Sequence, residues 1–356
     1  IRVRRPGTWR LEIRDEVPHG LGAGEPPPPI TAPGGEWCEV ALRTRAEARG
    51  RYELQAVYVR IERAGGLSDR VRRVSCPARL EVHPQVRALK TLELSAALAE
   101  GEEPQRRRGG EQAGTEFESL RPYGRGDPIR HIDWKATARR GEPIVRHHQI
   151  ERGQHLAIIL DVGRTMGSEI DGRSRLEYAV EAAVILGRLC QRRRDTMSVT
   201  AFSNRIEAEL PSTSGAEILP RTLHTLLELR PRAIESDYWN VFGRVLGRLT
   251  KRSLIVTFTD VGDADSSRGL IENLTRAARS HAVLCVVFED PAWMRVATDD
   301  RLALARRAGA RFALSERRAA QEVIRSRGVD VLPAQPEDLG LSLVARHAAL
   351  RSGAFA

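Results

Sequence analysis

The sequence has 356 residues, which suits two or three domains, and 41% of them are hydrophobic, enough to form buried cores. Its net charge of +10 comes mostly from arginine, and its four widely separated cysteines indicate neither a disulfide framework nor a zinc site. No apolar run approaches the roughly 20 residues of a membrane helix, and the chain begins with Ile1 rather than Met, so we interpret it as a soluble piece of a longer protein whose anchor lies upstream.

Residues 1–85 alternate apolar and polar side chains in short segments. The alternation is clearest at Trp9–Ile13 and Tyr52–Ile61, and a period of two is typical of strands with one buried face. Between these segments lies Pro26–Pro29, which cannot donate hydrogen bonds to a sheet and must be loop. We therefore predict a small all-β sandwich over residues 1–85, inside which the chain starts abruptly, and then a linker or exposed loop over residues 86–113.

Residues 114–150 are polar and rich in glycine and arginine, yet they contain large aromatic side chains. From residue 151 to residue 356 the pattern changes, and short apolar runs alternate with helical periodicity. The sequence predicts strands at 156–160, 197–201, 254–259, 282–288 and 328–332, and helices starting at the Ser174/Glu177 capping box, near 217–229, 237–249, 267–279 and 299–327, and finally up to about 351. Such alternation predicts a doubly wound, mainly parallel α/β sheet.

Two aspartates, Asp161 and Asp260, directly follow predicted strands, where parallel sheets bind their ligands. The segment that starts at Asp161 resembles the metal-adhesion loop of von Willebrand factor A domains, whose pattern is Asp-x-Ser-x-Ser. The resemblance implies a metal site formed by Asp161, Thr165, Ser236 and Asp260. Glycine replaces the first serine at position 163, Ser236 replaces a threonine, and Arg164 adds a positive charge. We therefore expect a degenerate site that binds Mg²⁺ weakly or not at all, while its loops remain an interaction face.

Residues 114–139 carry a second and more specific resemblance. They match, at nearly every position, the signature G-x-E-F-x-S-L-R-x-Y-x-x-G-D-x-x-R-x-I-D-W-x-A-x-A-R of the bacterial family called domain of unknown function 58. The residues singled out in this segment are Phe117, Arg121, Tyr123, Gly126, Asp127, Arg130, His131, Asp133, Trp134 and Arg139. We expect Trp134 to be a buried apolar anchor that packs the segment against the α/β domain.

This family resemblance implies a von Willebrand factor A-like α/β domain preceded by a small β-sandwich and, further upstream, by two membrane helices. Members are usually encoded beside MoxR-type AAA+ ATPases and are thought to act with them in protein maturation or assembly. The resemblance therefore implies a non-catalytic protein-interaction module at the cytoplasmic face of the inner membrane. Its expected partner is a MoxR-type AAA+ ATPase, and the sequence does not identify the clients.

Two other functions are compatible with parts of the sequence. Residues 119–148 contain seven Lys/Arg against three Asp/Glu and would suit nucleic acid, but arginine is spread over the whole chain and aromatic residues are few for a stacking platform. A metal-dependent hydrolase would use His131, Asp133, His147 and His148. No catalytic motif accompanies these residues, and adjacent histidines in a strand face opposite sides.

Overall fold

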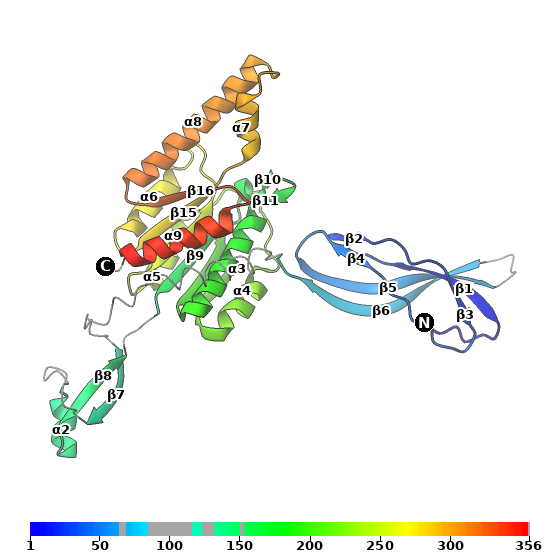
Figure 1. Cartoon of the computed structure of the whole chain (residues 1–356), viewed down its shortest axis with the longest axis horizontal. Helices are drawn as coiled ribbons and strands as arrows, with labels where there is room; N and C mark the ends of the chain where they lie inside the picture. The colour runs from blue at the N-terminus through cyan, green and yellow to red at the C-terminus, as the bar shows by residue number, and fades with distance from the viewer. Residues whose placement is uncertain (64–68, 85–115, 123–131, 150–152, 355–356) are drawn as a thin grey trace. The chain divides into compact units, whose positions relative to one another are not determined.

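A computed structural model describes residues 1–63, 69–84, 116–122, 132–149 and 153–354 (Figure 1). The chain divides into two compact units, residues 1–85 with 223–229 and residues 86–222 with 230–356. The predicted linker at 86–113 lies outside the described residues. Within the described ranges, no helix combines the length and the apolar character that a membrane crossing requires.

The first unit contains the antiparallel β region that the alternating pattern predicted. A four-stranded sheet has the order β3-β1-β5-β6, and β2 pairs with β4. The strands are β1 (Thr8–Asp15), β2 (Leu21–Ala23), β3 (Ile30–Pro33), β4 (Thr44–Ala46), β5 (Gly50–Arg63) and β6 (Asp69–Val82). Leu11 and Ile13 of β1 and Val59 of β5 form the core of this sheet, so the apolar positions of the pattern mark its buried face.

The second unit is built on a six-stranded sheet of order β13-β12-β9-β14-β15-β16. Its strands are β9 (His155–Asp161), β12 (Thr196–Phe202), β13 (Ile206–Ser214), β14 (Leu254–Thr259), β15 (Ala282–Phe288) and β16 (Asp330–Ala334). All neighbouring pairs are parallel except β12–β13. The central strands β9 and β14 are buried from Leu156 to Asp161 and from Leu254 to Thr259, as expected of a sheet covered on both faces. This is the predicted von Willebrand factor A-like arrangement.

Helices cover both faces of this sheet (Figure 1). They are α3 (Arg175–Arg193), α4 (Ile218–Leu226), α5 (Tyr238–Arg248), α6 (Arg268–Ala278), α7 (Pro291–Thr298), α8 (Leu304–Ser326) and α9 (Leu339–Ala354), with short turns η2 (Arg164–Gly167) and η3 (Gly215–Glu217) and a small hairpin of β10 (Glu169–Ile170) and β11 (Arg173–Ser174). The apolar sides of α5, α6 and α8 share one core with the sheet. The predicted cap is confirmed, because the Ser174 hydroxyl accepts the Glu177 backbone N–H.

Two elements of this unit differ from the sequence prediction. The antiparallel edge strand β13 was not predicted, and the helix predicted over 299–327 is preceded by a separate helix, α7. Asp290 caps α7 and Pro291 occupies its first turn, a combination that favours a helix start. The loop that follows α7 breaks the helical pattern, so α7 and α8 form a hairpin.

The signature segment forms a β-hairpin of β7 (Glu116–Pro122) and β8 (Ile144–Gln149) with a short helix, α2 (Trp134–Arg140), between them. Asp133 caps α2 by accepting the backbone N–H groups of Lys135 and Ala136. None of the helix residues is buried.

Candidate functional site

The ends of β9 and β14 bring two carboxylates to the same edge of the sheet. Asp161 is the last residue of β9, and Asp260 directly follows β14. The two strands are parallel neighbours whose register pairs Leu160 with Phe258. Asp161 is fully buried at 0% exposure, and the Asp260 side chain is 9% exposed. The predicted convergence of these two side chains therefore follows from the strand register.

Four donors of the chain itself surround the Asp161 carboxylate. Its Oδ1 accepts the Gly163 backbone N–H at 2.8 Å and the Ser236 hydroxyl at 2.5 Å. Its Oδ2 accepts the hydroxyls of Tyr238 at 2.8 Å and Thr259 at 2.7 Å. Burial, and next the charge of Asp161, raises the pKa of Tyr238 well above its ordinary value of 10. The phenol therefore stays protonated and remains a donor to the carboxylate.

Gly163 stands where the metal-adhesion pattern has its first serine. Its φ of −68° and ψ of −176° are open to any residue, so the local space rather than the backbone conformation favours glycine. A Cβ added at Gly163 would lie 2.2 Å from Ser236 Oγ and 3.0 Å from the Ile234 carbonyl oxygen. The Ser236 side chain thus takes the space of the missing serine, and these two departures from the pattern compensate each other.

Two arginines neutralise Asp260. Arg175, at the start of α3, pairs with Asp260 Oδ2, and Arg317, in the middle of α8, pairs with Oδ1. Arg317 also donates to the Phe288 carbonyl oxygen at 3.1 Å. The side chains of Arg175 and Arg317 are 7% and 21% exposed, so this ion triad is largely removed from water. It joins α3, β14 and α8 at the carboxyl edge of the sheet.

Arg164 lies on the rim and turns toward another partner. Its guanidinium donates to Glu235 at 2.6 Å, and both side chains are mostly exposed. The Arg164 backbone N–H donates to the Ile234 carbonyl oxygen at 3.0 Å. The positive charge expected to oppose a metal at this loop is therefore largely compensated by Glu235, and the guanidiniums beside Asp260 are the stronger opposition.

The residues at this edge do not fit a Mg²⁺ ion as they are arranged. Mg²⁺ requires oxygen ligands in a near-ideal octahedron. The oxygens of Asp161 accept four internal donors, and those of Asp260 face two guanidinium groups. At the third predicted ligand, Thr165, the backbone carbonyl oxygen lies 3.5 Å from Arg175 Nη1. The arrangement favours a centre in which arginine supplies the positive charge.

We accordingly predict that Mg²⁺ and Mn²⁺ bind with a dissociation constant weaker than about 1 mM, the weak end for hard divalent cations in proteins. Isothermal titration of the full chain measures this affinity, and thermal melts with and without the ions should coincide. A micromolar affinity that disappears in Asp161→Ala would contradict the prediction.

Sequence reasoning did not identify Arg175, Arg317 or Tyr238 as parts of this centre. Arg175 gave a usable signal, because it occupies the first turn of α3, where the helix dipole disfavours a positive charge. Arg317 lies in an arginine-rich helix and Tyr238 follows a helix cap, and neither context points to the site.

Only some of the predicted signature residues lie in the parts of the chain that the structure describes. Tyr123, Gly126, Asp127, Arg130 and His131 lie outside the described residues, and Phe117 and Arg121 belong to β7, with side chains outside the description. Asp133 caps α2, and Arg139 lies exposed in the last turn of that helix.

The prediction that Trp134 is a buried anchor is wrong in this structure, since its side chain is 67% exposed. A seven-residue helix beside a two-stranded hairpin offers too little apolar surface to cover an indole. The cost of roughly 3–5 kcal/mol expected for truncating a buried tryptophan therefore does not apply to Trp134.

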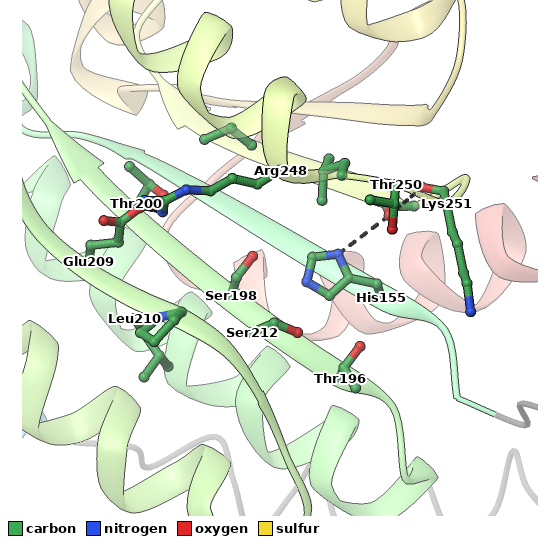
Figure 2. Close-up of a pocket in the computed structure, with 14 residues that line it drawn as sticks. His155, Thr196, Ser198, Thr200, Glu209, Leu210, Ser212, Arg248, Thr250 and Lys251 are labelled. Carbon is green, nitrogen blue, oxygen red and sulfur yellow. Dashed lines mark hydrogen bonds and ion pairs between the residues drawn. The ribbon is translucent and has the colours of Figure 1, made fainter. Parts of the chain in front are cut away.

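A separate hollow of about 590 Å³ lies near the opposite, amino-terminal edge of the sheet (Figure 2). Hydroxyl side chains of Thr196, Ser198 and Ser212 line it, and Arg248 pairs with Glu209 at its side. Ligands of parallel sheets bind at the carboxyl ends of the strands. This hollow is therefore the weaker candidate for a functional site.

His155 lines this hollow and should make stability depend on pH. Burial, and next His281, lowers the pKa of His155 below its ordinary 6.5. The His155 Nε2 atom is buried with no hydrogen-bond partner among the described residues. Below pH 6.5 the unfolded chain takes up a proton that the folded chain resists, so stability is present above this pH and falls as the pH is lowered through it.

Denaturant unfolding at about pH 7.5 and about pH 5.5 tests this effect. The wild type should lose more stability on acidification than His155→Gln, which has no titrating ring. His281, whose pKa is also lowered by burial, is present in both proteins and gives each of them a background loss. Equal losses of stability in the two proteins would contradict the assignment of the pH dependence to His155.

In the parts of the chain that the structure describes, no group of three or more His, Cys, Asp and Glu side chains could hold a metal ion. Of the residues considered for a hydrolase, His131 and the side chains of His147 and His148 lie outside those parts.

Comparisons with known proteins relate the chain to a family and to several solved structures. BatB from Bacteroides thetaiotaomicron is 16% identical, with 55% of this chain and 100% of that chain covered and a TM-score of 0.38. An aerotolerance-related membrane protein from Bacteroides fragilis is 13% identical, with 56% and 100% covered and a TM-score of 0.38. The ArnB paralog VWA2 from Sulfolobus acidocaldarius is 10% identical, with 95% and 54% covered and a TM-score of 0.30.

A search of curated proteins finds no match. The family described as "Protein of unknown function DUF58" matches residues 119–321. This range covers more than half of the 356 residues and contains the strands, loops and helices that form the Asp161 and Asp260 centre. The chain therefore belongs to the DUF58 family.

Proposed function

We propose that this chain is a non-catalytic protein-interaction module, an adaptor or partner of a MoxR-type AAA+ ATPase in protein maturation or complex assembly. The main observation behind the proposal is that both carboxylates at the carboxyl edge of the sheet are engaged by other groups of the chain itself. Asp161 accepts four internal donors, and Asp260 is paired with Arg175 and Arg317. Carboxylates engaged in this way are poor general bases and poor nucleophiles.

Exposed apolar side chains beside this centre support a binding role. Ile234, in the loop before α5, is 45% exposed, and Trp239, in the first turn of α5, is 53% exposed. The Arg164–Glu235 ion pair joins η2 to the loop that contains Ile234. An aromatic and an aliphatic anchor with charged neighbours are typical of protein-binding surfaces. We take these loops and the start of α5 as the face that contacts the partner, with no metal required.

The family resemblance also supports a location at the cytoplasmic face of the inner membrane, with anchoring through segments upstream of Ile1. In this arrangement the ATPase would supply the chemical energy, and the chain would supply recognition. The chain by itself should therefore have no turnover.

The test uses the purified chain and a MoxR-type ATPase from the same genome, mixed with ATP or with ADP. We expect a complex with a dissociation constant below about 10 μM in at least one nucleotide state. The double variant Ile234→Ser/Trp239→Ser should weaken it about tenfold, equivalent to roughly 1.4 kcal/mol. Leu341→Ser, at a half-exposed position on α9, is the matched control. The absence of a complex in both nucleotide states would reject the ATPase as partner.

A further inference from the structure

The α7–α8 hairpin carries a surface that the proposed function does not use. Figure 1 shows α7 beside the first half of α8, and both project away from the six-stranded sheet. We call this the α7–α8 surface and define it by Trp293, Met294, Leu304, Arg311, Phe312 and Arg318.

Large apolar side chains are concentrated on this surface. Trp293, Met294, Leu304 and Phe312 are four of the twelve exposed large hydrophobic residues in the described parts of the chain, and they lie within 20 residues of each other. Leu304 is 76% exposed and Phe312 is 67% exposed. Single exposed apolar residues are common, whereas a cluster of them marks an interaction site.

Helical geometry aligns the residues of α8 with a hollow. Leu304, Arg311 and Arg318 are spaced by seven residues and so share one side of the helix, while Phe312 flanks this row. Arg311 and Arg318 line a hollow of about 340 Å³ between α7 and α8, together with the apolar side chains of Met294, Ala297 and Leu314. The lining of the hollow therefore combines apolar side chains with two arginines and two hydroxyl side chains.

The charge of the hairpin is strongly positive. Residues 291–319 contain seven arginines against three acidic residues. Arg317 forms an ion pair with Asp260, and Arg307 forms one with Asp300. In the part of the chain that the structure describes, Arg318 makes no ion pair, and Arg311 donates only to a backbone carbonyl oxygen, that of Ala297. Positive charge is thus available to an acidic ligand.

The Arg317–Asp260 contact fixes the hairpin to the site at the sheet edge. Arg317 lies one residue before Arg318 and reaches both Asp260 and the Phe288 carbonyl oxygen. The far half of α8 packs into the main core through Ala320 and Ile324. The hairpin is therefore a projecting arm whose base is packed on the sheet and tied to Asp260 at its carboxyl edge.

We propose that the α7–α8 surface binds an acidic protein segment that inserts an apolar side chain into the hollow between the two helices. The carboxylates of this segment pair with Arg311 and Arg318, and its apolar residues pack on Phe312. A protein ligand is favoured over an anionic membrane because the surface is hollowed between the two helices and can take a single apolar side chain, and because Asp299 and Asp300 lie exposed in the turn at the tip of the arm. The inference rests on the proposed binding role but not on the identity of the ATPase.

The test starts from a displayed library of random peptides of about 12 residues, a length that can combine an apolar anchor with flanking charges. The library is selected on the full chain, and the dissociation constants of enriched peptides are measured by fluorescence anisotropy. We expect enriched peptides to be acidic with at least one leucine or aromatic residue. Phe312→Ala and Arg318→Glu should each weaken their binding about tenfold, since both side chains are exposed and their replacement leaves the fold intact.

Leu341→Ala and Arg279→Glu, which change exposed residues on α9 and at the end of α6, are the matched controls and should leave binding unchanged. Enriched peptides without an acidic bias, or peptides that bind all four variants equally, would overturn the inference. Vesicles of phosphatidylcholine and phosphatidylglycerol provide a second arm. If the wild type binds the vesicles, the two hairpin variants do not, and no acidic peptides are enriched, the ligand of this surface is a membrane and not a protein segment.

The same protein preparations separate this inference from the proposed function. A complex with the MoxR-type ATPase, without binding of acidic peptides, overturns the inference alone. Binding of acidic peptides without an ATPase complex overturns the ATPase as partner and supports the inference.

Discussion

Replacing Asp260 by alanine is expected to destabilise the chain by about 3–5 kcal/mol, the usual cost of breaking a buried ion pair by removing one partner. The substitution leaves Arg175, whose side chain is 7% exposed, without its carboxylate partner. It also removes the ion pair between Arg317 and Asp260. An uncompensated buried guanidinium costs much more than the lost attraction alone. The contact of α8 with the sheet edge is weakened at the same time.

Denaturant unfolding of Asp260→Ala and of the wild type measures this difference. Asp265→Ala is the matched control, because Asp265 is 92% exposed, pairs with an exposed Arg268, and should change stability by less than about 0.5 kcal/mol. The triple variant Asp260→Ala/Arg175→Met/Arg317→Met should recover part of the loss, since it leaves no buried guanidinium without its carboxylate. A loss below about 1 kcal/mol for the single variant would show that the triad is not a buried ion network.

The second large effect is expected at Asp161. Asp161→Ala removes the acceptor of the Gly163 N–H and of the hydroxyls of Ser236, Tyr238 and Thr259 in a fully buried position. We predict a loss of roughly 2–4 kcal/mol, because buried donors without acceptors cost about 1–3 kcal/mol each. The Tyr238 and Thr259 hydroxyls, 2.9 Å apart, can still bond to each other and limit the loss.

Asp161→Asn should lose less than Asp161→Ala, because the amide oxygen retains the acceptor role toward Gly163 and Ser236. Asp300→Ala, at an aspartate that is 84% exposed, is the control for a lost surface carboxylate. The loss should be the same with and without Mg²⁺. A destabilisation that appears only when Mg²⁺ is present would mean that Asp161 acts as a metal ligand rather than as a hydrogen-bond acceptor.

Much of the fold could be predicted from local patterns. The runs at 254–259 and 282–288 are strands with the predicted bounds, because only a central strand is buried on both faces and therefore apolar throughout. The strand β13 shows the limit of this reasoning. Ile206, Ala208 and Leu210 do alternate with glutamates, but an edge strand buries few side chains and its signal resembles that of an exposed loop.

The candidate site was only partly predictable. Strand ends located Asp161 and Asp260, since the carboxyl ends of parallel strands meet at one edge. The substitution of glycine at position 163 was visible, but its cause was not, because the Ser236 hydroxyl that fills the space comes from 73 residues further along the chain. Trp134 illustrates the opposite error, in which the residue type predicted burial and the local structure leaves the side chain exposed.

The sequence by itself determined the alternation of strands and helices, the positions of Asp161 and Asp260 at the ends of strands, and the family signature. Each of these depends only on residues that are close to one another along the chain. Only the tertiary structure decided the chemistry of the centre. Arg175 and Arg317 are 142 residues apart in sequence and meet at Asp260 through the packing of α3 and α8 on the sheet. Whether a carboxylate faces a metal or a guanidinium depends on which side chains, distant in sequence, the fold brings within a few ångströms of it. The local sequence pattern does not show which side chains these are.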